Sequence, residues 1–333
     1  MKTLTKVGLS ALAGALAVTS ANAGTMEISG SIVGSYSKGS GYHNTGSPLG
    51  MDKELSVTGS GELDGGTTVS YKQTITDAMA FNDSEIVFGN ILGTTATLAM
   101  TSTGDPMSAI DDVTPTAFEE ANAITGSIKD VNGIDGSYSL RVTQADVMGS
   151  GVKLDAAYAF RHGSGDAATE KGSSGVDSAG QQDGWSVTAT GSVPMIDGLT
   201  AGAGYAMLDS TDLSTGDKFT EEGTAYVKYA SGPVSIGYQR GGVNVEAASK
   251  AIYINEYVGI SYKISDALSV SYNEAESRKS TDTSDVTQEW DSVSLSYTMG
   301  SMTLGIVDQE VDNATYTSGR TSEETAIQMT VAF

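Results

Sequence analysis

The chain has 333 residues, 41 acidic against 18 basic side chains, a formal net charge of −23 and no cysteine. This acidity argues against nucleic acid as a partner, which would require a basic surface, and favours attraction of cations over anions. Without disulfides, an exported protein of this size has to be stabilised in another way, and a closed hydrogen-bonded barrel is one such way.

The N-terminal residues follow the pattern of a secretory signal peptide. Lys2 and Lys6 precede an apolar run from Val7 to Val18, and Ala21-Asn22-Ala23 supplies a small-residue cleavage site. The run is too short to span a membrane as a helix. The alternative, a buried N-terminal helix, would not require these three regions in order. We therefore expect residues 1–23 to be a signal peptide and residues 24–333 the mature domain, whose net charge would be −25 once the two lysines are removed.

The rest of the chain alternates apolar and polar residues in short segments. No stretch approaches eighteen consecutive apolar residues, which argues against a transmembrane helix. Segments of period two, bounded by Gly, Asp, Asn or Ser, predict sixteen strands. They are expected at 26–36, 53–63, 66–75, 84–91, 93–101, 136–144, 151–160, 184–193, 198–207, 223–230, 233–240, 252–262, 267–273, 290–298, 301–308 and 324–333. Most would cross an apolar band of about 25 Å at a tilt of about 45°.

The predicted connections are sorted by length. Those after even-numbered strands are short, at 64–65, 92, 145–150, 194–197, 231–232 and 265–266. Those after odd-numbered strands are long, notably 102–135, 161–183, 208–222, 274–289 and 309–323. This sorting is typical of a transmembrane barrel with both termini on the short-turn side. A soluble β-sandwich, the alternative, has no reason to sort its loops in this way.

Aromatic residues mark both ends of the predicted strands. Odd-numbered strands end on Tyr36, Phe160, Tyr205, Tyr238 and Tyr272, and even-numbered strands end on Tyr229, Tyr262, Tyr297 and Phe333. Two such levels match the interfacial girdles of a membrane barrel, although tyrosine also favours strands in general. In the last strand, Ile327, Met329, Val331 and Phe333 share one face, and the chain stops on an aromatic residue.

One residue breaks the alternation. Glu256 shares the predicted lipid-facing side of Ile254 and Val258, where a charge at mid-depth would be costly. We expect either a β-bulge that resets the register or a position of Glu256 nearer the long-loop side.

With sixteen strands, a long third connection and a terminal Phe333, the mature chain resembles a Gram-negative general diffusion porin of the alphaproteobacterial type. The resemblance rests on architecture, because the proline-aromatic-glycine signature of enterobacterial third loops is absent: Pro115 and Phe118 are present without a glycine pair. It implies an all-β fold, a 16-stranded antiparallel transmembrane β-barrel with short periplasmic turns, long extracellular loops and an inward-folded third loop. It also implies location in the cell outer membrane, contact with lipid and lipopolysaccharide, insertion by the barrel-assembly machinery, and a homotrimer.

By the same resemblance, loop 102–135 would narrow the pore. Its acids are Asp105, Asp111, Asp112, Glu119, Glu120, Asp130 and Asp135, against the single base Lys129. Inside a lumen this loop would focus a negative potential that favours cations; otherwise it is a solvated acidic surface loop. Lys72, Arg141 and Lys153 have lumen-facing parity and would form the opposing basic cluster, unless they pair locally with Glu62, Glu85 or Asp155.

The first strands carry a candidate protomer interface. Gly30, Gly34, Gly59 and Gly61 thin the predicted outward face, which allows close packing between barrels, although glycine also relieves barrel curvature. In loop 76–83, Met79, Ala80 and Phe81 form an apolar tip that would latch onto a neighbour.

The predicted function is passive, weakly cation-selective diffusion of ions and small hydrophilic solutes. The alternative is a substrate-selective channel, for example for sugars, which would need more lumen aromatics than Tyr226, Tyr253 and Tyr257. A barrel with a plugged lumen is a third possibility, with only loop 102–135 available as a plug. The two histidines, His43 and His162, fall in predicted loops and no triad or metal-ligand spacing stands out, so we expect no enzyme, metal or cofactor.

Overall fold

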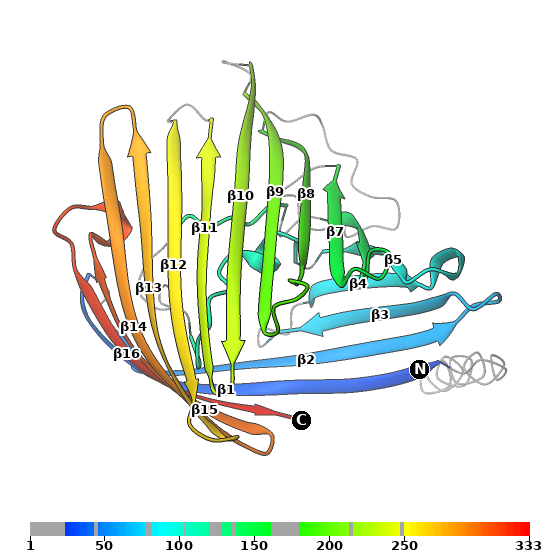
Figure 1. Ribbon diagram of the computed structural model, residues 1–333, viewed down its shortest axis with the longest axis horizontal. Coiled ribbons are helices and arrows are strands. Elements are labelled where there is room, and N and C mark those ends of the chain that lie inside the picture. Colours follow the sequence, from blue (N-terminus) through cyan, green and yellow to red (C-terminus); the bar gives the residue numbers. More distant parts are fainter. Residues whose placement is uncertain are drawn as a thin grey trace, which may run out of the picture.

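The computed structural model describes residues 24–42, 46–76, 81–102, 104–119, 128–134, 138–160, 180–212, 216–246 and 250–333. These residues form one antiparallel sheet of sixteen strands that closes on itself, because β1 is hydrogen-bonded to both β2 and β16 (Figure 1). The predicted fold, a 16-stranded antiparallel barrel with sequential neighbours, is therefore confirmed. Within the described residues, no helix is both long enough and apolar enough to span a membrane.

The strands are β1 (Thr25–Gly41), β2 (Leu49–Glu62), β3 (Thr68–Ile75), β4 (Phe81–Gly89), β5 (Ala96–Thr101), β6 (Ser139–Gln144), β7 (Val152–Ala159), β8 (Gly180–Ser192), β9 (Leu199–Asp212), β10 (Gly216–Ser231), β11 (Val234–Val245), β12 (Ala251–Lys263), β13 (Leu268–Thr281), β14 (Asp285–Met299), β15 (Met302–Asp312) and β16 (Ser322–Ala332). Three short 3₁₀ turns accompany them: η1 (Ile91–Gly93), η2 (Ser108–Ile110) and η3 (Ala314–Tyr316).

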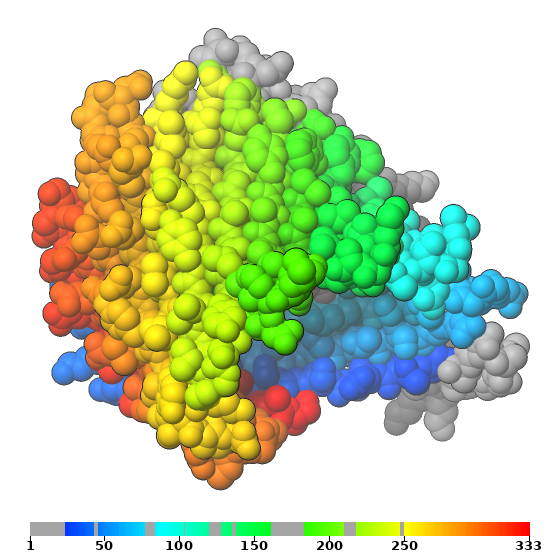
Figure 2. Space-filling model, viewed as in Figure 1, coloured from blue at the N-terminus to red at the C-terminus, as the bar shows by residue number. Residues whose placement is uncertain are grey.

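The barrel buries polar side chains and exposes apolar ones. On β12, Val258, Ile260 and Tyr262 are exposed on the outer surface, whereas the alternate residues Asn255 and Tyr257 are buried inside. A water-soluble protein would show the reverse distribution. Figure 2 shows this outer surface as a continuous wall from β8 to β14. An apolar exterior around a polar interior is the arrangement required of a barrel surrounded by lipid.

The outer apolar band ends at a level of tyrosines near the long-loop end of the strands. The hydroxyl of Tyr205 donates to Glu221 at 2.7 Å, and that of Tyr272 donates to Asp291 at 2.6 Å. Each ring therefore has its apolar body on the band and its hydroxyl against a carboxylate beyond it, as expected at a lipid–water boundary. Tyr229, Tyr262, Tyr297 and Phe333 are exposed toward the short-turn end.

Glu256 belongs to this boundary level, and no bulge is present. The pairing of β11 with β12 runs without a register shift and places Glu256 opposite Arg240. The two side chains form an ion pair at 3.2 Å, and the hydroxyl of Tyr238 donates to Glu256 at 3.0 Å. The bulge interpretation is wrong, because the outward carboxylate lies on the loop side of the tyrosine level, where water is available.

Two connections expected to be long loops are strands instead. Most of 208–222 continues the β9–β10 hairpin, which leaves only residues 213–215 between the strands, and 274–289 continues β13–β14, which leaves 282–284. Beyond the apolar band both faces of a hairpin meet water or the lumen, so the sequence there is polar throughout and loses the alternation that marked the rest. The predicted loops 102–135 and 309–323 do connect β5 to β6 and β15 to β16.

The chain ends close the cylinder. Gly30 and Phe333 exchange backbone hydrogen bonds of 2.8 and 3.0 Å, which fixes the last residue on β1. The Phe333 ring lies over Gly30, where a Cβ would come within 3.1 Å of it. The absence of a side chain at Gly30 therefore makes room for the terminal aromatic ring.

Candidate functional site in the lumen

We call the connection between β5 and β6, residues 102–138, L3; its described parts, 104–119 and 128–134, enter the barrel and lie along its inner wall. Its outgoing leg, 104–119, crosses from β8 toward β15, and its return leg, 128–134, comes back nearer the long-loop end. Figure 1 shows this segment behind β8–β12. L3 therefore covers one side of the lumen, and a pore would run between L3 and the opposite wall.

Inward-facing glycines make room for the outgoing leg. A Cβ on Gly204 would lie 2.5 Å from Met107 Sδ, and one on Gly237 would lie 2.5 Å from Pro115 Cδ. A Cβ on Gly305 would overlap the Phe118 ring. These wall glycines let the backbone of L3 approach the sheet closely, which brings Met107, Pro115 and Phe118 into contact with it. 

Inward polar side chains satisfy the backbone of the same leg. Gln239, fully buried, accepts the N–H of Val113 at 2.8 Å and donates to the carbonyl of Ile110 at 2.8 Å. Ser271 and Ser294 on β13 and β14 accept the N–H groups of Ala117 and Phe118 at 2.8 and 3.1 Å. A loop away from bulk water needs such partners, so these alternating polar residues hold L3 in place.

Two carboxylates fix the root of L3. Asp105, which is 1% exposed, accepts the N–H of Met107 at 2.6 Å and the hydroxyl of Ser186 at 2.5 Å. Glu222 on β10 accepts the N–H groups of Asn132 and Gly133, both at 2.6 Å. Gly133 has φ +58°, and a Cβ there would overlap Asp105. Burial raises the pKa of Asp105 to about 6, although its hydrogen bonds act in the opposite direction.

A third carboxylate, Asp130, attaches the return leg to β12. It accepts hydrogen bonds from the hydroxyl of Tyr257 and from Asn255 Nδ2, the latter at 3.0 Å. Burial raises the pKa of Asp130 to about 7, and the nearby charge of Asp111 adds to the shift.

The remaining predicted acids of L3 are less buried. Asp111, Asp112 and Glu119 lie on the outgoing leg with part of their surface exposed. Glu120 and Asp135 lie outside the described residues. L3 thus brings Asp111 and Asp112 together at its middle, with Asp105 buried at its root.

The predicted basic residues lie beside acidic residues of the inner wall. Arg141 makes a two-point contact with Asp155, with Nε at 2.8 Å from Oδ1 and an ion pair to Oδ2, and Lys153 Nζ lies 3.1 Å from the same Oδ2. Asp155 is buried and also accepts the hydroxyl of Thr143. Lys72 is separate, on the inward side of β3 opposite Glu85. Two of the three bases therefore share one carboxylate, which reduces the positive field they present.

The lumen aromatics are engaged with other parts of the barrel. Tyr257 is buried beneath L3, and Lys228 Nζ lies 5.3 Å from the ring centroid of Tyr226. Lys279 Nζ lies 5.6 Å from the centroid of Tyr253. A continuous aromatic track along the wall, as a sugar channel would need, is not formed by these three tyrosines.

The predicted interface residues lie on the outer side of the first strands. A Cβ on Gly34 or Gly59 would meet no atom within 4 Å, and one on Gly61 would meet only Gly24, at 3.8 Å. Phe81 begins β4, but its side chain and residues 77–80 lie outside the described residues.

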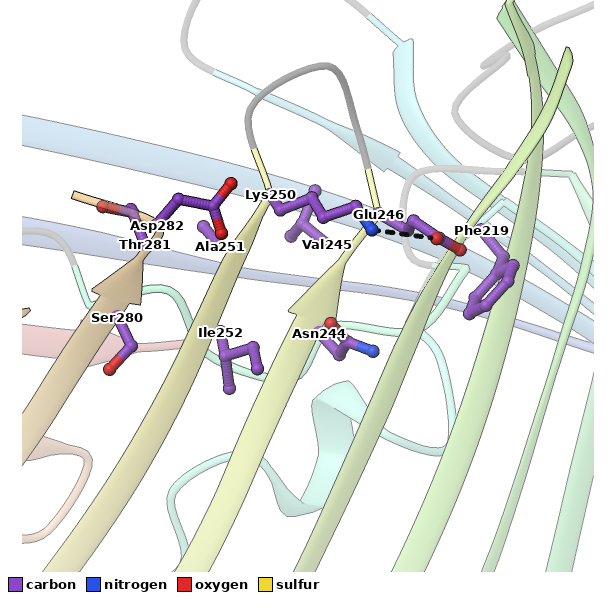
Figure 3. Close-up of a pocket in the computed structure, with 10 residues that line it drawn as sticks. All are labelled: Phe219, Asn244, Val245, Glu246, Lys250, Ala251, Ile252, Ser280, Thr281 and Asp282. Atoms are coloured by element: carbon purple, nitrogen blue, oxygen red, sulfur yellow. Dashed lines mark ion pairs between the residues drawn. The ribbon is translucent and has the colours of Figure 1, made fainter. Parts of the chain in front are cut away.

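A recess of about 380 Å³ opens at the rim between the ends of β10–β13 (Figure 3). Its charges, Lys250 and Glu246, pair with each other at 3.6 Å. By register, Asn244, Ile252 and Ser280 are on the outward side of their strands and Val245, Ala251 and Thr281 are on the inward side, so the recess lies across the rim of the barrel. In the described residues no group of His, Cys, Asp or Glu is arranged to hold a metal ion, and His43 and His162 lie outside them.

Comparisons with known proteins agree with this architecture. OmpT of Vibrio cholerae, solved in a trimer form, superposes with a TM-score of 0.68 at 10% identity, covering 93% of this chain and 99% of that one. An anion-selective porin from Comamonas acidovorans gives 0.65 at 13% identity (93% and 100% coverage), and Salmonella typhi OmpF in complex with daunomycin gives 0.63 at 12% (92% and 97%). No curated protein sequence matched the chain.

These similarities show a shared fold, and the assignment of the chain rests on a sequence model. The model for Gram-negative porins matches residues 8–331, nearly the whole chain. The closed sixteen-stranded barrel and the loop folded into its lumen are consistent with that match. The chain belongs to the Gram-negative porin family, whose members are non-enzymatic channels that mediate diffusion across the outer membrane.

Proposed function

We propose that this porin is a general diffusion channel of the alphaproteobacterial type, passive and weakly cation-selective, for ions and small hydrophilic solutes. The family establishes diffusion across the outer membrane; the ion preference and the subtype go beyond it. The observation that carries the ion preference is the charge of L3. Its described acids lie along the lumen wall with one base, Lys129, among them.

The charged side chains of the lumen support a preference for cations over anions. Asp111, Asp112 and Glu119 are partly exposed on L3, within a narrow passage of low-dielectric walls that concentrates their field. On the other side, Arg141 and Lys153 share Asp155, so their positive charge is partly compensated. A negative loop facing a weakly positive wall attracts cations and repels anions.

The fold alone does not decide the sign of the preference. The Comamonas acidovorans porin named as anion-selective has the same architecture at 13% identity. The preference therefore has to come from the charged residues at the constriction, for which we propose Asp105, Asp111, Asp112, Glu119, Glu120, Lys72, Arg141 and Lys153.

For maturation and assembly, we propose that residues 1–23 are removed on export and that 24–333 is inserted by the barrel-assembly machinery into a membrane of lipid and lipopolysaccharide. We also propose a homotrimer, which Vibrio cholerae OmpT in its trimer form supports by analogy. Gly30, Gly34, Gly59, Gly61 and Phe81 would form the protomer interface, since most of these glycines leave open space on the outer face.

The alternative is a substrate-selective channel, for example for sugars. Tyr226 and Tyr253 each lie beside a lysine, and Tyr257 is covered by L3. This leaves few free aromatic faces on which a sugar ring would stack. Swelling of proteoliposomes in solutes of graded size distinguishes the two: a general channel sorts solutes by size, whereas a selective one favours a single solute over its isomers.

The ion preference is tested by neutralising L3. In planar bilayers under a KCl gradient, the variant with Asp111→Asn, Asp112→Asn, Glu119→Gln and Glu120→Gln should show a reversal potential closer to zero than the wild type. The matched control removes the same charge from the outer wall, by Glu274→Gln, Glu276→Gln, Glu289→Gln and Asp291→Asn, and should keep the wild-type value. Equal reversal potentials for wild type and the L3 variant would place the filter elsewhere and contradict the proposal.

A further inference from the structure

A second loop folds into the lumen beside L3. Residues 313–321, which connect β15 to β16 and which we call L8, contain the 3₁₀ turn η3. Ala314 in this turn is fully buried against Trp290 and Val311 of the wall. Ile128, from the return leg of L3, packs against the same cluster. L8 and L3 therefore meet inside the barrel on a shared apolar contact.

The backbone of L8 is held in an unfavourable conformation. Asn313, Thr315 and Tyr316 have φ values of 55°, 56° and 54°, a region that residues other than glycine seldom occupy and that is least suited to a β-branched threonine. The turn is fixed by Arg320, whose guanidinium donates to Thr315 Oγ1 at 2.7 Å and whose backbone carbonyl accepts the N–H of Ala314 at 2.8 Å. Strain of this kind persists only where the surroundings over-determine it, and it concentrates at functional positions.

The strained turn places the Tyr316 hydroxyl in a closed ring of hydrogen bonds with L3. Ser277 on β13 donates to Asn255 Oδ1 at 2.6 Å, and Asn255 Nδ2 donates to the carbonyl of Lys129 at 2.9 Å. The N–H of Lys129 donates to Tyr316 Oη at 3.2 Å. Since Ser277 has already used its proton, the 2.7 Å contact between Tyr316 and Ser277 has Tyr316 as the donor.

This ring of hydrogen bonds is connected to Asp130, the acid that attaches the return leg to β12. Asn255 Nδ2 also donates to Asp130 Oδ1 at 3.0 Å, and Tyr257 donates to the same oxygen. Lys129 is thus bound through its carbonyl by the wall and through its N–H by L8. Loss of Tyr316 would free the N–H and leave the return leg held on one side.

We propose that Tyr316 is a positioning residue that clamps the return leg of L3 between L8 and the wall, and thereby fixes the open cross-section of the pore. The inference rests on the proposed function, because it assumes that L3 borders a conducting pore. L8 thus restrains the return leg of L3, and the hydrogen bond to Tyr316 is the contact that provides this restraint.

Three single variants, and the double variant of Tyr316→Phe with Ser277→Ala, test the clamp in single-channel recordings. Tyr316→Phe, which removes only the hydroxyl, should raise the frequency of subconductance transitions about fivefold, as expected for loss of the hydrogen bond that joins L8 to L3. Tyr316→Ala, which also removes the ring contact with Tyr253, should raise it further. Ser277→Ala should resemble Tyr316→Phe, and the double variant should add little to either, because both act through one ring of hydrogen bonds.

Hydrogen exchange supplies a readout that conductance does not. The segment containing Lys129 should lose protection in Tyr316→Phe, while strand protection and the unfolding temperature of the barrel stay near wild type. Tyr297→Phe, at the exposed outer surface, is the matched control and should change neither measurement.

Wild-type transition frequency and wild-type exchange at Lys129 in Tyr316→Phe and Tyr316→Ala would overturn the clamp. If wild-type protein itself gave no conductance, the proposed function would fail instead, and the exchange measurement would still decide whether Tyr316 holds L3. The two failures are therefore distinguishable.

Discussion

At the residue scale, the lumen of this porin is organised by carboxylates with different tasks. Asp105 is buried and Asp130 is half-buried, and both receive hydrogen bonds from the wall, so they attach L3. Asp111 and Asp112 are half-buried on the outgoing leg and are proposed to act on the passing ions. One loop therefore carries both its own anchors and the charge proposed to select ions.

The anchoring acids predict a pH dependence. Burial raises the pKa of Asp130 to about 7 and that of Asp105 to about 6, so both lose their charge as pH falls from 8 to 5. The cation preference, measured as reversal potential, should therefore weaken over this range. The pKa of each acid is higher in the folded protein than in the unfolded chain, so the protonated carboxyl favours docking of L3. Docking is therefore most favourable at low pH and weakens as pH rises through about 6 to 7.

Asp130→Asn should remove the upper part of this titration. Asp197→Asn, in a short turn far from L3 along the chain, is the control and should retain it. A reversal potential that stays flat between pH 8 and pH 5 in the wild type would show that the buried acids do not contribute to selectivity.

The shared carboxylate predicts a second effect. Asp155→Asn would leave Arg141 and Lys153 without their common partner, adding one positive charge to the lumen. The reversal potential should shift toward the anion side, and the unfolding temperature should fall because a partly buried arginine loses its partner. Thr143→Val removes the neutral hydrogen bond to Asp155 and keeps the charge, so its selectivity should match the wild type. An unshifted potential in Asp155→Asn would mean that these bases are remote from the ion path.

At the scale of elements, L3 depends on glycines in the strands it crosses. In Gly305→Ala the new Cβ would overlap the Phe118 ring, and overpacking of this kind costs about 1–3 kcal/mol. The loop is easier to displace than the barrel wall, so we expect altered conductance with little loss of barrel stability. Gly223→Ala is the matched control, since its Cβ would lie 3.8 Å from its nearest neighbours. Wild-type conductance in Gly305→Ala would indicate that Phe118 has room elsewhere.

Most of the elements could be predicted because lipid on one side and water on the other impose a period of two on every strand. The strand prediction failed where the contrast between lipid and water is absent. Residues 208–222 and 274–289 are mostly polar on both faces, so these strand extensions were predicted as loops. The insertion of L8 left even less trace, because Ala314 and Tyr316 occur in a short stretch with no apolar periodicity. The burial of Ala314 depends on Trp290, Tyr257 and Ile128, which the chain brings together only when the barrel closes.

The residue types of the site could be predicted from the sequence, but their contacts could not, because these contacts form only when the barrel closes. The acid content of L3 could be read from the sequence, but the burial of Asp105 and Asp130 depends on wall residues far along the chain, such as Ser186 and Asn255. Lys153 and Asp155 are two residues apart on β7, so their pairing could be considered from the sequence, whereas only the register of β6 with β7 brings Arg141 to the same carboxylate.

At the scale of the whole molecule, the outer face of β1 and β2 predicts the site of assembly. Gly34→Leu together with Gly59→Leu would fill the open space there and should prevent close packing of protomers. Ala225→Leu, on β10, is the control on another part of the outer wall. Electrophoresis of unheated samples should show trimers for wild type and control and monomeric barrels for the glycine variant. Trimers that persist in the glycine variant would move the interface elsewhere.

The most direct test of the whole account is a recording of purified wild-type protein in a planar bilayer under a KCl gradient. A cylinder with lipid outside, water inside and an acidic L3 on its inner wall should produce stepwise, ohmic conductance with a reversal potential on the cation side. Absence of conductance steps, or a reversal potential on the anion side, would contradict it.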